Sequence, residues 1–335
     1  MTSGADKPRS SAIDALRVGA IVAVAASHLW GEYEVVRALT FSWHVPMFFF
    51  LAGYLWTTRA ADARRTTRSE IVTRFRTLVV PFAAWTTIFG VLTIGYLVST
   101  TGVTIEGVLS TLWGGARARG PWSPYWFLPV LFFATVLYRW LEGRRIGPRL
   151  SIAIGGTAVA VCYLVGDQLA LWTPQDIAIA VPMLLLLGAG SLVRRYEGLV
   201  RGRAVWGASF LLTSLVLLLV GWAAPLDMKL GDFGTPVISV AVSLLICTGL
   251  LWVALTALPG SLPGKIGDFI SESARTSVVV LLTHTFAYWL LSAQLQVPRP
   301  VVFVVTVTGT IGLGVLLHRT RLSQWLVGIP TRRKS

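Results

Sequence analysis

The sequence predicts an all-α integral membrane protein, a bundle of about ten transmembrane helices with both termini in the cytoplasm. Hydrophobic residues make up 54% of the 335 residues, charged residues make up 13%, and the mean hydropathy is +0.69. No ordinary soluble domain of this length has such a composition. The apolar runs are about 17 to 23 residues long, which suits helices that cross a bilayer, and they lack the alternating pattern of a membrane β-barrel.

Ten apolar runs are expected to be the spans of a single membrane-embedded domain over residues 1–335. Residues 1–11 and 319–335 are then short cytoplasmic tails. The N-terminal segment has no small-residue cleavage site after a clean apolar core, so no removable signal peptide is expected. The predicted spans cover about 12–30, 41–58, 77–98, 124–140, 150–166, 177–193, 204–224, 236–258, 275–294 and 300–318.

The basic residues predict how this bundle is oriented. If Met1 is cytoplasmic, 23 Lys and Arg residues fall in inside segments and five fall in outside segments. This asymmetry predicts cytoplasmic termini, an even number of spans and a multi-pass protein of the cell membrane. It also explains the net charge of +14 without nucleic acid as a partner. Cys162 and Cys247 lie in apolar runs without metal-ligand spacing, so we expect buried thiols and no metal site.

The first span carries three polar side chains on one face. Arg17 and His28 are eleven residues apart, so on a helix they lie within about 20° of one face and roughly 16 Å apart along the axis. Asp14 lies one turn below Arg17. Hydrocarbon tolerates such groups only where protein or water surrounds them. This helix alone leaves two readings open: a structural Asp14–Arg17 pair with a hydrogen-bonded His28, or a functional site.

Polar groups recur where the second and third spans begin. His44 starts the second span on the side of the membrane where His28 ends the first, and Gly53 in that span allows a neighbouring helix to approach closely. Arg74 and Arg76 stand where the third span enters from the cytoplasm. Their guanidinium groups suit phosphate recognition by paired hydrogen bonds, although cytoplasmic arginines also serve topology alone.

Three later residues were considered as site candidates. Trp126 follows the outer loop at 99–123 and either belongs to an interfacial aromatic belt or stacks on a sugar ring. His284 is a third imidazole near mid-depth in the ninth span. His318 ends the tenth span among arginines, where we expect it to be solvated or to extend to the interface, and it receives no function.

Five motifs occur in one order along nearly the whole chain. They are Asp14-Ala-Leu-Arg17 with His28; Trp43-His-Val-Pro-Met-Phe-Phe-Phe-Leu-Ala-Gly-Tyr54; Arg74-Phe-Arg76 before Pro81; Tyr125-Trp-Phe-Leu128; and Ile266-Gly-Asp-Phe-Ile-Ser271 leading to Leu282-Thr-His284. In this order they resemble the acyltransferase-3 family of multi-pass membrane O-acyltransferases, particularly its fucose 4-O-acetylase-like branch. Two features depart from that branch: Ala52 replaces the usual serine, and the tyrosine often found shortly before the ninth-span histidine is missing.

The resemblance implies transfer of an acyl group, commonly acetyl, from cytoplasmic acetyl-CoA as donor co-substrate to a hydroxyl of a carbohydrate or glycoside at the extracytoplasmic side. A sugar hydroxyl is a poor nucleophile, and a neutral imidazole can take its proton during attack on the thioester. His28 is the expected base, Arg17 the residue that holds coenzyme A, and Asp14 the residue that orients Arg17. The remaining expected contacts are Arg74 and Arg76 with the nucleotide phosphates, and His44, Trp126, His284 and Tyr54 with the acceptor.

Other functions and steps stay open at this point. Intramembrane charge also suits a transporter or flippase of a lipid-linked sugar, although no half-to-half repeat of interrupted spans is evident. A haem or quinone protein is less favoured, because no histidines are expected in pairs on facing helices at comparable depth. No activated serine or cysteine is evident, which favours direct transfer over an acyl-enzyme, while an acyl-histidine intermediate remains open. Acceptor identity, acyl length and oligomeric state are undetermined.

Overall fold

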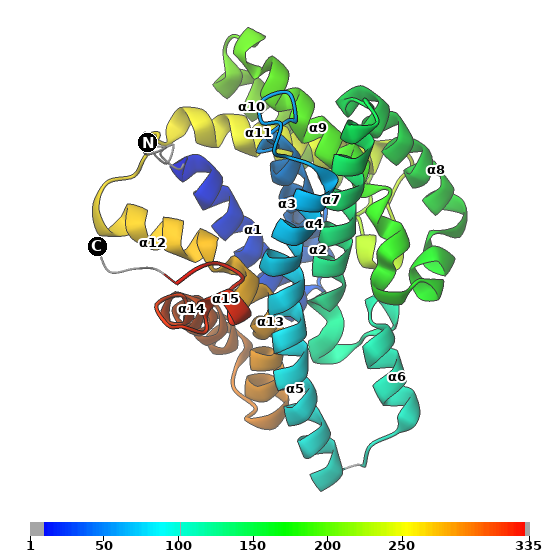
Figure 1. Ribbon diagram of the computed structural model, residues 1–335, viewed down its shortest axis with the longest axis vertical. Coiled ribbons are helices and arrows are strands. Elements are labelled where there is room, and N and C mark those ends of the chain that lie inside the picture. Colours follow the sequence, from blue (N-terminus) through cyan, green and yellow to red (C-terminus); the bar gives the residue numbers. More distant parts are fainter. Residues whose placement is uncertain (1–9, 101, 332–335) are drawn as a thin grey trace.

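The computed structural model describes residues 10–100 and 102–331, and within them every regular element is a helix (Figure 1). Of the predicted tails at 1–11 and 319–335, residues 1–9 and 332–335 lie outside the described residues. The first half holds α1 (Ser11–Trp30), α2 (Glu34–Phe41), α3 (His44–Tyr54), α4 (Thr67–Arg74), η1 (Phe75–Val79), α5 (Val80–Ser99), α6 (Ile105–Trp113), η2 (Gly115–Arg117), η3 (Gly120–Trp126), α7 (Phe127–Gly143) and α8 (Pro148–Trp172). The second half holds η4 (Pro174–Ala180), α9 (Met183–Tyr196), η5 (Glu197–Leu199), α10 (Arg203–Leu219), η6 (Met228–Leu230), α11 (Ile238–Ala257), α12 (Gly264–Arg275), α13 (Ser277–Tyr288), η7 (Trp289–Gln294), α14 (Arg299–His318) and α15 (Ser323–Leu326).

The expected all-α membrane architecture is confirmed. Among the described residues, seven helices are long and apolar enough to span a bilayer, and the bent pair that ends in α9 makes an eighth if it is counted as one span. Helices α7 and α10, at 17 residues each, cover the two remaining predicted spans but fall below that length. The count of ten and the placement of the termini therefore stay predictions.

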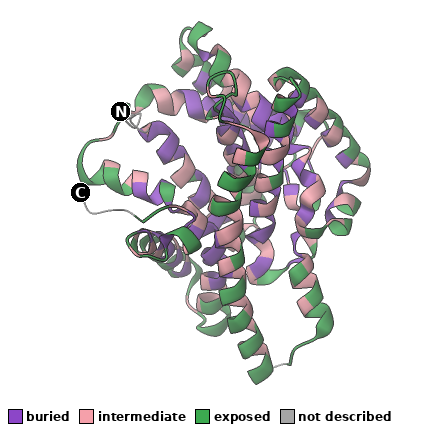
Figure 2. Cartoon of the chain, viewed as in Figure 1, coloured by how far each residue is buried: buried purple, intermediate pink, exposed green. Residues whose placement is uncertain are grey.

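Helix α1 lies at the centre of the packing. It contacts α3, α11, α12, α13 and α14, so residues from both halves of the chain surround it (Figure 1). Its N-terminus is tied to the segment before α12, because the amide of Leu262 donates to the Ser11 hydroxyl at 2.6 Å. The outward faces of peripheral helices such as α5 and α10 are exposed while the centre is buried (Figure 2). In a protein that crosses a bilayer, those apolar outward faces meet lipid.

Helices α3 and α9 approach so closely that their backbones nearly touch. A Cβ atom added at Gly53 would lie 1.9 Å from the Leu187 carbonyl oxygen, and one added at Gly190 would lie 2.0 Å from the Phe50 carbonyl oxygen. The Ser191 hydroxyl adds a 3.0 Å hydrogen bond to the Gly53 carbonyl. The close approach expected at Gly53 is thus confirmed, and this contact holds the helix that carries His44 in place.

We expect Gly190→Ala to destabilise the protein by about 1–3 kcal/mol, because the new methyl group forces α3 and α9 apart in a tightly packed interface. Thermal unfolding in detergent micelles measures the change. Gly95→Ala is the matched control, since a Cβ at Gly95 on α5 meets nothing within 4 Å. An equal melting temperature in the two variants would contradict this account of the interface.

His318 is placed differently from the solvated position expected. Its side chain is only 3% exposed, and Nδ1 lies 2.5 Å from Oε1 of Glu272 at the end of α12. Its Nε2 contacts the Pro330 carbonyl oxygen at 3.1 Å. The expectation failed because residues 323–331 fold back over the end of α14, which hydropathy alone does not reveal. His318 therefore joins α12, α14 and the C-terminal segment.

Candidate active site

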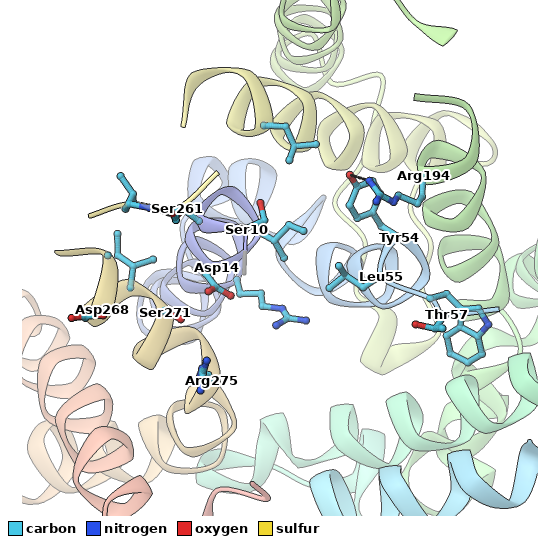
Figure 3. Close-up of a pocket in the computed structure, with 18 residues that line it drawn as sticks. Ser10, Asp14, Tyr54, Leu55, Thr57, Arg194, Ser261, Asp268, Ser271 and Arg275 are labelled. Atoms are coloured by element: carbon cyan, nitrogen blue, oxygen red, sulfur yellow. Dashed lines mark hydrogen bonds between the residues drawn. The ribbon is translucent and has the colours of Figure 1, made fainter. Parts of the chain in front are cut away.

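A cavity of about 990 Å³ opens at the N-terminal end of α1, the end that the charge asymmetry predicts to be cytoplasmic, between α1, the end of α3, α9 and α12. Three guanidinium groups line it, those of Arg17, Arg194 and Arg275, together with Asp14 and Tyr54. Figure 3 shows Asp14 and Arg275 on one side of this cavity and the hydrogen-bonded pair of Tyr54 and Arg194 on the other. Such a set of cations around a cavity suits a polyanionic ligand, because guanidinium groups bind phosphates with paired hydrogen bonds.

Tyr54 forms one wall of this cavity and is held there by hydrogen bonds. Its hydroxyl donates to the Glu197 carboxylate, with 2.9 Å to Oε2, and Arg194 Nη1 donates to Oε1 of the same carboxylate at 2.6 Å. Arg194 Nη1 also donates to the Tyr54 hydroxyl oxygen at 3.2 Å. Tyr54 was expected to bind the acceptor, and the structure places it at the cytoplasmic cavity. It is therefore separated from the histidines that were expected to share its role.

A second cavity of about 240 Å³ continues from the first one toward the middle of the membrane. Arg17, Leu55, Trp56 and Thr57 line both cavities, so the two are adjacent along α1 and the end of α3. Arg74 lines the second cavity and not the first, and its Nε donates to Oε1 of Glu70 at 2.7 Å. The exposed Arg76, in contrast, is not among the residues described as lining either cavity.

Arg139 on α7 forms the floor of this second cavity and was missed by the sequence analysis. The side chain is only 1% exposed, with Nε 3.3 Å from Glu70 Oε2 and Nη1 2.5 Å from Glu142 Oε2. Nη2 donates to the Thr57 carbonyl at 3.0 Å, and the guanidinium carbon lies 4.0 Å from the centroid of the Trp56 ring. The buried guanidinium of Arg139 thus joins α4, α7 and the segment after α3 in the wall of this cavity. Its sequence signal is a single arginine at the end of the predicted span 124–140, where a basic residue is also expected from membrane topology alone.

Two of the expected histidines line a third, small cavity of about 30 Å³, which lies toward the C-terminal end of α1 and the N-terminal end of α3, the ends predicted to be outer. His28 and His44 line it together with Trp126 from η3 and Phe48 from α3. His28 is solvent-accessible, whereas His44 is 4% exposed. The break between α2 and α3, where Trp43 has φ −145° and ψ −28°, turns His44 back toward α1. The structure therefore brings together His28, His44 and Trp126. The sequence predicted only that these residues lie at the same side of the membrane.

His284 packs directly against His28 from α13. The two ring centroids are 5.1 Å apart, and the planes are inclined by 56°. Because Nδ1 of His284 contacts the Val280 carbonyl at 2.9 Å, and a carbonyl only accepts, Nδ1 carries the proton in the neutral ring. The remaining Nε2 of His284 is buried without a hydrogen-bond partner among the described residues. His284 thus supports His28 from behind and is not among the residues described as lining the small cavity.

The contact between His28 and His284 contradicts one expectation from the sequence. No histidines were expected in pairs on facing helices, and these two do form such a pair. The sequence could not show this, because the depth of a residue in a span does not tell which helices are neighbours. The two rings are too close to each other for a porphyrin to fit between them. This distance is evidence against a haem bound by both histidines.

The 3-10 segment η3 covers the histidines on the outer side and is held by several contacts. The Tyr125 hydroxyl donates to the Leu282 carbonyl at 3.0 Å, and the Thr285 hydroxyl donates to the Pro121 carbonyl at 2.6 Å. Lys229 Nζ donates to the Ser123 hydroxyl at 3.0 Å. Burial lowers the pKa of Lys229, although nearby carboxylates act in the opposite direction. These contacts fix Trp126 above the small cavity.

Phe48 forms part of the wall of both the second and the small cavity. Its ring meets that of Phe127 edge to face, with centroids 5.4 Å apart. Arg17 lines the cavity on one side of Phe48 and His28 lines the cavity on the other, while α1 carries both residues. Phe48 is thus a wall that the two cavities share.

The sequence analysis missed two more cations of the large cavity, Arg194 and Arg275, and had counted them only as topological charge. Arg194 lies in the last turn of α9 and Arg275 ends α12, where a basic side chain is also favourable to the helix dipole. Only the fold shows that both arginines line the same cavity as Arg17. No periodicity within their own segments could have separated them from the exposed cytoplasmic arginines.

Comparison with known proteins gives one match. The family model Acyl_transf_3, described as an acyltransferase domain, matches residues 10–319, which is nearly the whole chain. No curated protein and no solved structure gives a significant match. The matched range includes all three cavities and each site residue considered above.

Proposed function

The chain belongs to the acyltransferase-3 family, and from that membership we propose an O-acyltransferase that moves an acyl group, commonly acetyl, from a cytoplasmic acyl-CoA to a carbohydrate or glycoside hydroxyl at the outer side of the cell membrane. One observation supports this direction of transfer. Helix α1 extends from the cation-lined cytoplasmic cavity, where it places Arg17, to the outer cavity, where it places His28.

The cytoplasmic cavity is proposed to hold coenzyme A. Arg17, Arg194 and Arg275 would bind its phosphate groups, and the volume of about 990 Å³ matches a large cofactor site. The pantetheine arm would extend through the second cavity past Arg17 toward Phe48. This arrangement delivers the thioester to the boundary of the outer cavity.

The outer cavity is proposed to hold the acceptor hydroxyl beside His28. The neutral imidazole accepts the hydroxyl proton while the oxygen attacks the thioester carbonyl. The carbon–sulfur bond then breaks, and the departing thiolate takes the proton from the imidazolium, which leaves an ester and free coenzyme A. His284 packs against the His28 ring, with ring centroids 5.1 Å apart, and would hold it in position during transfer. Trp126 and His44 would position the sugar.

The test is transfer of labelled acetyl from acetyl-CoA by the purified, membrane-reconstituted protein to glycoside acceptors on the side opposite to the donor. Mass spectrometry of the acceptor identifies the ester. Esterified acceptor together with free coenzyme A is the expected result. Counterflow of a sugar substrate without any consumption of acetyl-CoA would instead favour a transporter.

We expect Arg17→Ala to raise the KM for acetyl-CoA by about 10- to 100-fold, which corresponds to the loss of about 1.5–3 kcal/mol from hydrogen bonds to a charged phosphate. Arg17→Lys should restore part of the affinity, since lysine keeps the charge but not the planar fork. Steady-state kinetics with varied donor measure the change. Arg68→Ala is the matched control, an exposed cytoplasmic arginine on α4. An unchanged donor KM in Arg17→Ala would remove Arg17 from the donor site.

A further inference from the structure

An apolar groove of about 640 Å³ faces the membrane between α5, α13 and α14 and is not used by the proposed reaction. Its walls include Phe89, Phe286 and Gly309. The stacked rings of Phe89 and Phe286, with centroids 3.8 Å apart, form its inner part, and Gly309 leaves space on α14. The groove has the width and chemistry of a site for a hydrocarbon chain.

The groove continues into a second space, whose lining includes arginines, unlike that of the groove. This hollow of about 1190 Å³ lies between α5, α6 and η3, and Thr93, Tyr96 and Trp289 line both spaces. The rings of Tyr96 and Trp289 meet edge to face at 4.9 Å and form the common rim. The two spaces are therefore one continuous surface, which is apolar in the groove and carries two arginines in the hollow. Figure 1 shows α5 and α6 extending side by side to the lower edge of the molecule.

The outer hollow carries arginines and tryptophans. Arg117 and Arg119 line it and are exposed, and among the described residues neither lies within ion-pair distance of a carboxylate. Arg117 Nε donates to the Leu171 carbonyl at 3.0 Å, so its guanidinium is held in place. Trp113 and Trp122 add aromatic faces, on which the C–H groups of a sugar ring pack. One anionic group and a sugar therefore fit this hollow, while the groove fits the chain that anchors them.

The hollow also lies next to the proposed reaction centre. Pro121 and Trp122 of η3 line the hollow, whereas Pro124 and Trp126 of the same segment line the cavity with His28. Three residues of 3-10 helix span about 6 Å, which is less than the length of one sugar unit and its linkage. A head group that starts in the hollow can thus reach across η3 toward His28.

We propose that the acceptor is a lipid-linked sugar, whose hydrocarbon chain lies in the groove, whose linking phosphate is bound by Arg117 and Arg119, and whose sugar reaches His28 around η3. The proposal rests on the proposed acyl transfer and specifies its acceptor class. A free, water-soluble glycoside would leave both the groove and the two arginines without a role.

Binding tests the lipid site without the reaction. Purified full-length protein in phosphatidylcholine nanodiscs is titrated with a radiolabelled polyprenyl monophosphate. Gly309→Leu fills the groove and Arg119→Gln removes one phosphate contact, so each should raise the Kd at least 10-fold. The controls are Gly312→Leu, also on α14 with open space around its Cβ, and Arg299→Gln, an outer arginine paired with Glu32. Both controls should bind as the wild type does.

Competition identifies the source of the ligand. Uncharged polyprenol and inorganic phosphate should displace the probe at least 10-fold less well than unlabelled polyprenyl phosphate, since each lacks one of the two recognised parts. Displacement by phosphatidylglycerol as effective as by polyprenyl phosphate would mean an ordinary lipid site and would overturn the proposal.

Acyl transfer separates this proposal from the proposed function. We expect kcat/KM for a polyprenyl-phosphate-linked sugar to exceed that for the matching soluble glycoside at least 10-fold, and Gly309→Leu to lower only the former. Equal use of both acceptors, with no effect of Gly309→Leu, would overturn the lipid site while acyl transfer stands. Selective binding of the probe without transfer to any acceptor would support the lipid site and remove the proposed activity.

Discussion

Replacing His28 by alanine is expected to lower kcat for acyl transfer by about 10²- to 10⁴-fold, the usual contribution of a positioned general base. His28 is the solvent-accessible imidazole of the outer cavity, and it packs against His284. Without it, the acceptor hydroxyl has no positioned group to take its proton. The KM for acetyl-CoA should stay near the wild-type value, because the cytoplasmic cavity lies on the other side of Phe48.

The measurement is single-turnover acetyl transfer by purified protein, together with a thermal melt to exclude unfolding. Leu29→Ala is the neighbouring control, since Leu29 packs against the cluster that includes Tyr288 and Val302. Full activity in His28→Ala would exclude this residue as the base. A large rise in donor KM with kcat unchanged would place His28 in the donor site instead.

The second large effect is expected from Arg139→Ala, which should destabilise the protein by about 3–5 kcal/mol. The substitution leaves the Glu70 carboxylate, only 3% exposed, and that of Glu142 without their shared cation. Glu70 then keeps only Arg74 as a cation, with Nε 2.7 Å from Oε1, and a buried carboxylate that loses part of its charge compensation is costly in a low-dielectric interior. The melting temperature in detergent micelles should fall clearly below that of Arg144→Ala, which removes an exposed arginine stacked on Trp140.

A combined variant tests whether the unpaired charges cause this loss. Arg139→Met with Glu70→Gln and Glu142→Gln removes the cation and both carboxylates together, so it should be more stable than Arg139→Ala. A triple variant that melts below Arg139→Ala would mean that the packing of the guanidinium over Trp56 matters more than charge balance. Equal melting temperatures for Arg139→Ala and Arg144→Ala would contradict the network altogether.

The fold was largely predictable because hydropathy reports the depth of each segment. The predicted spans at 12–30, 236–258 and 300–318 agree with α1, α11 and α14 within a few residues. The span expected at 41–58 was placed too late: the run begins with α2 at Glu34 and is broken before α3. The charged residues Glu34 and Arg37 in the eight residues of α2 kept this segment out of the predicted span.

The site was predictable only where residues share one helix. Arg17 and His28 were placed correctly on α1 because helical periodicity fixes their relation. Residues from distant helices depend on which helices are neighbours, and this information is not local. For that reason Arg139 went unnoticed, and His284 was expected in the cavity and not behind the His28 ring.

Phe48 has a consequence for the cell as well as for the reaction. A protein with water-accessible cavities on both sides of a bilayer would dissipate ion gradients if the cavities joined into a pore. The ring of Phe48, held edge to face by Phe127, forms a wall common to the inner and outer spaces. An uncharged acyl thioester loses little hydration free energy beside aromatic rings. An ion would have to lose its hydration shell there, which is costly. Under the proposed transfer, Phe48 therefore favours passage of the acyl group over passage of ions.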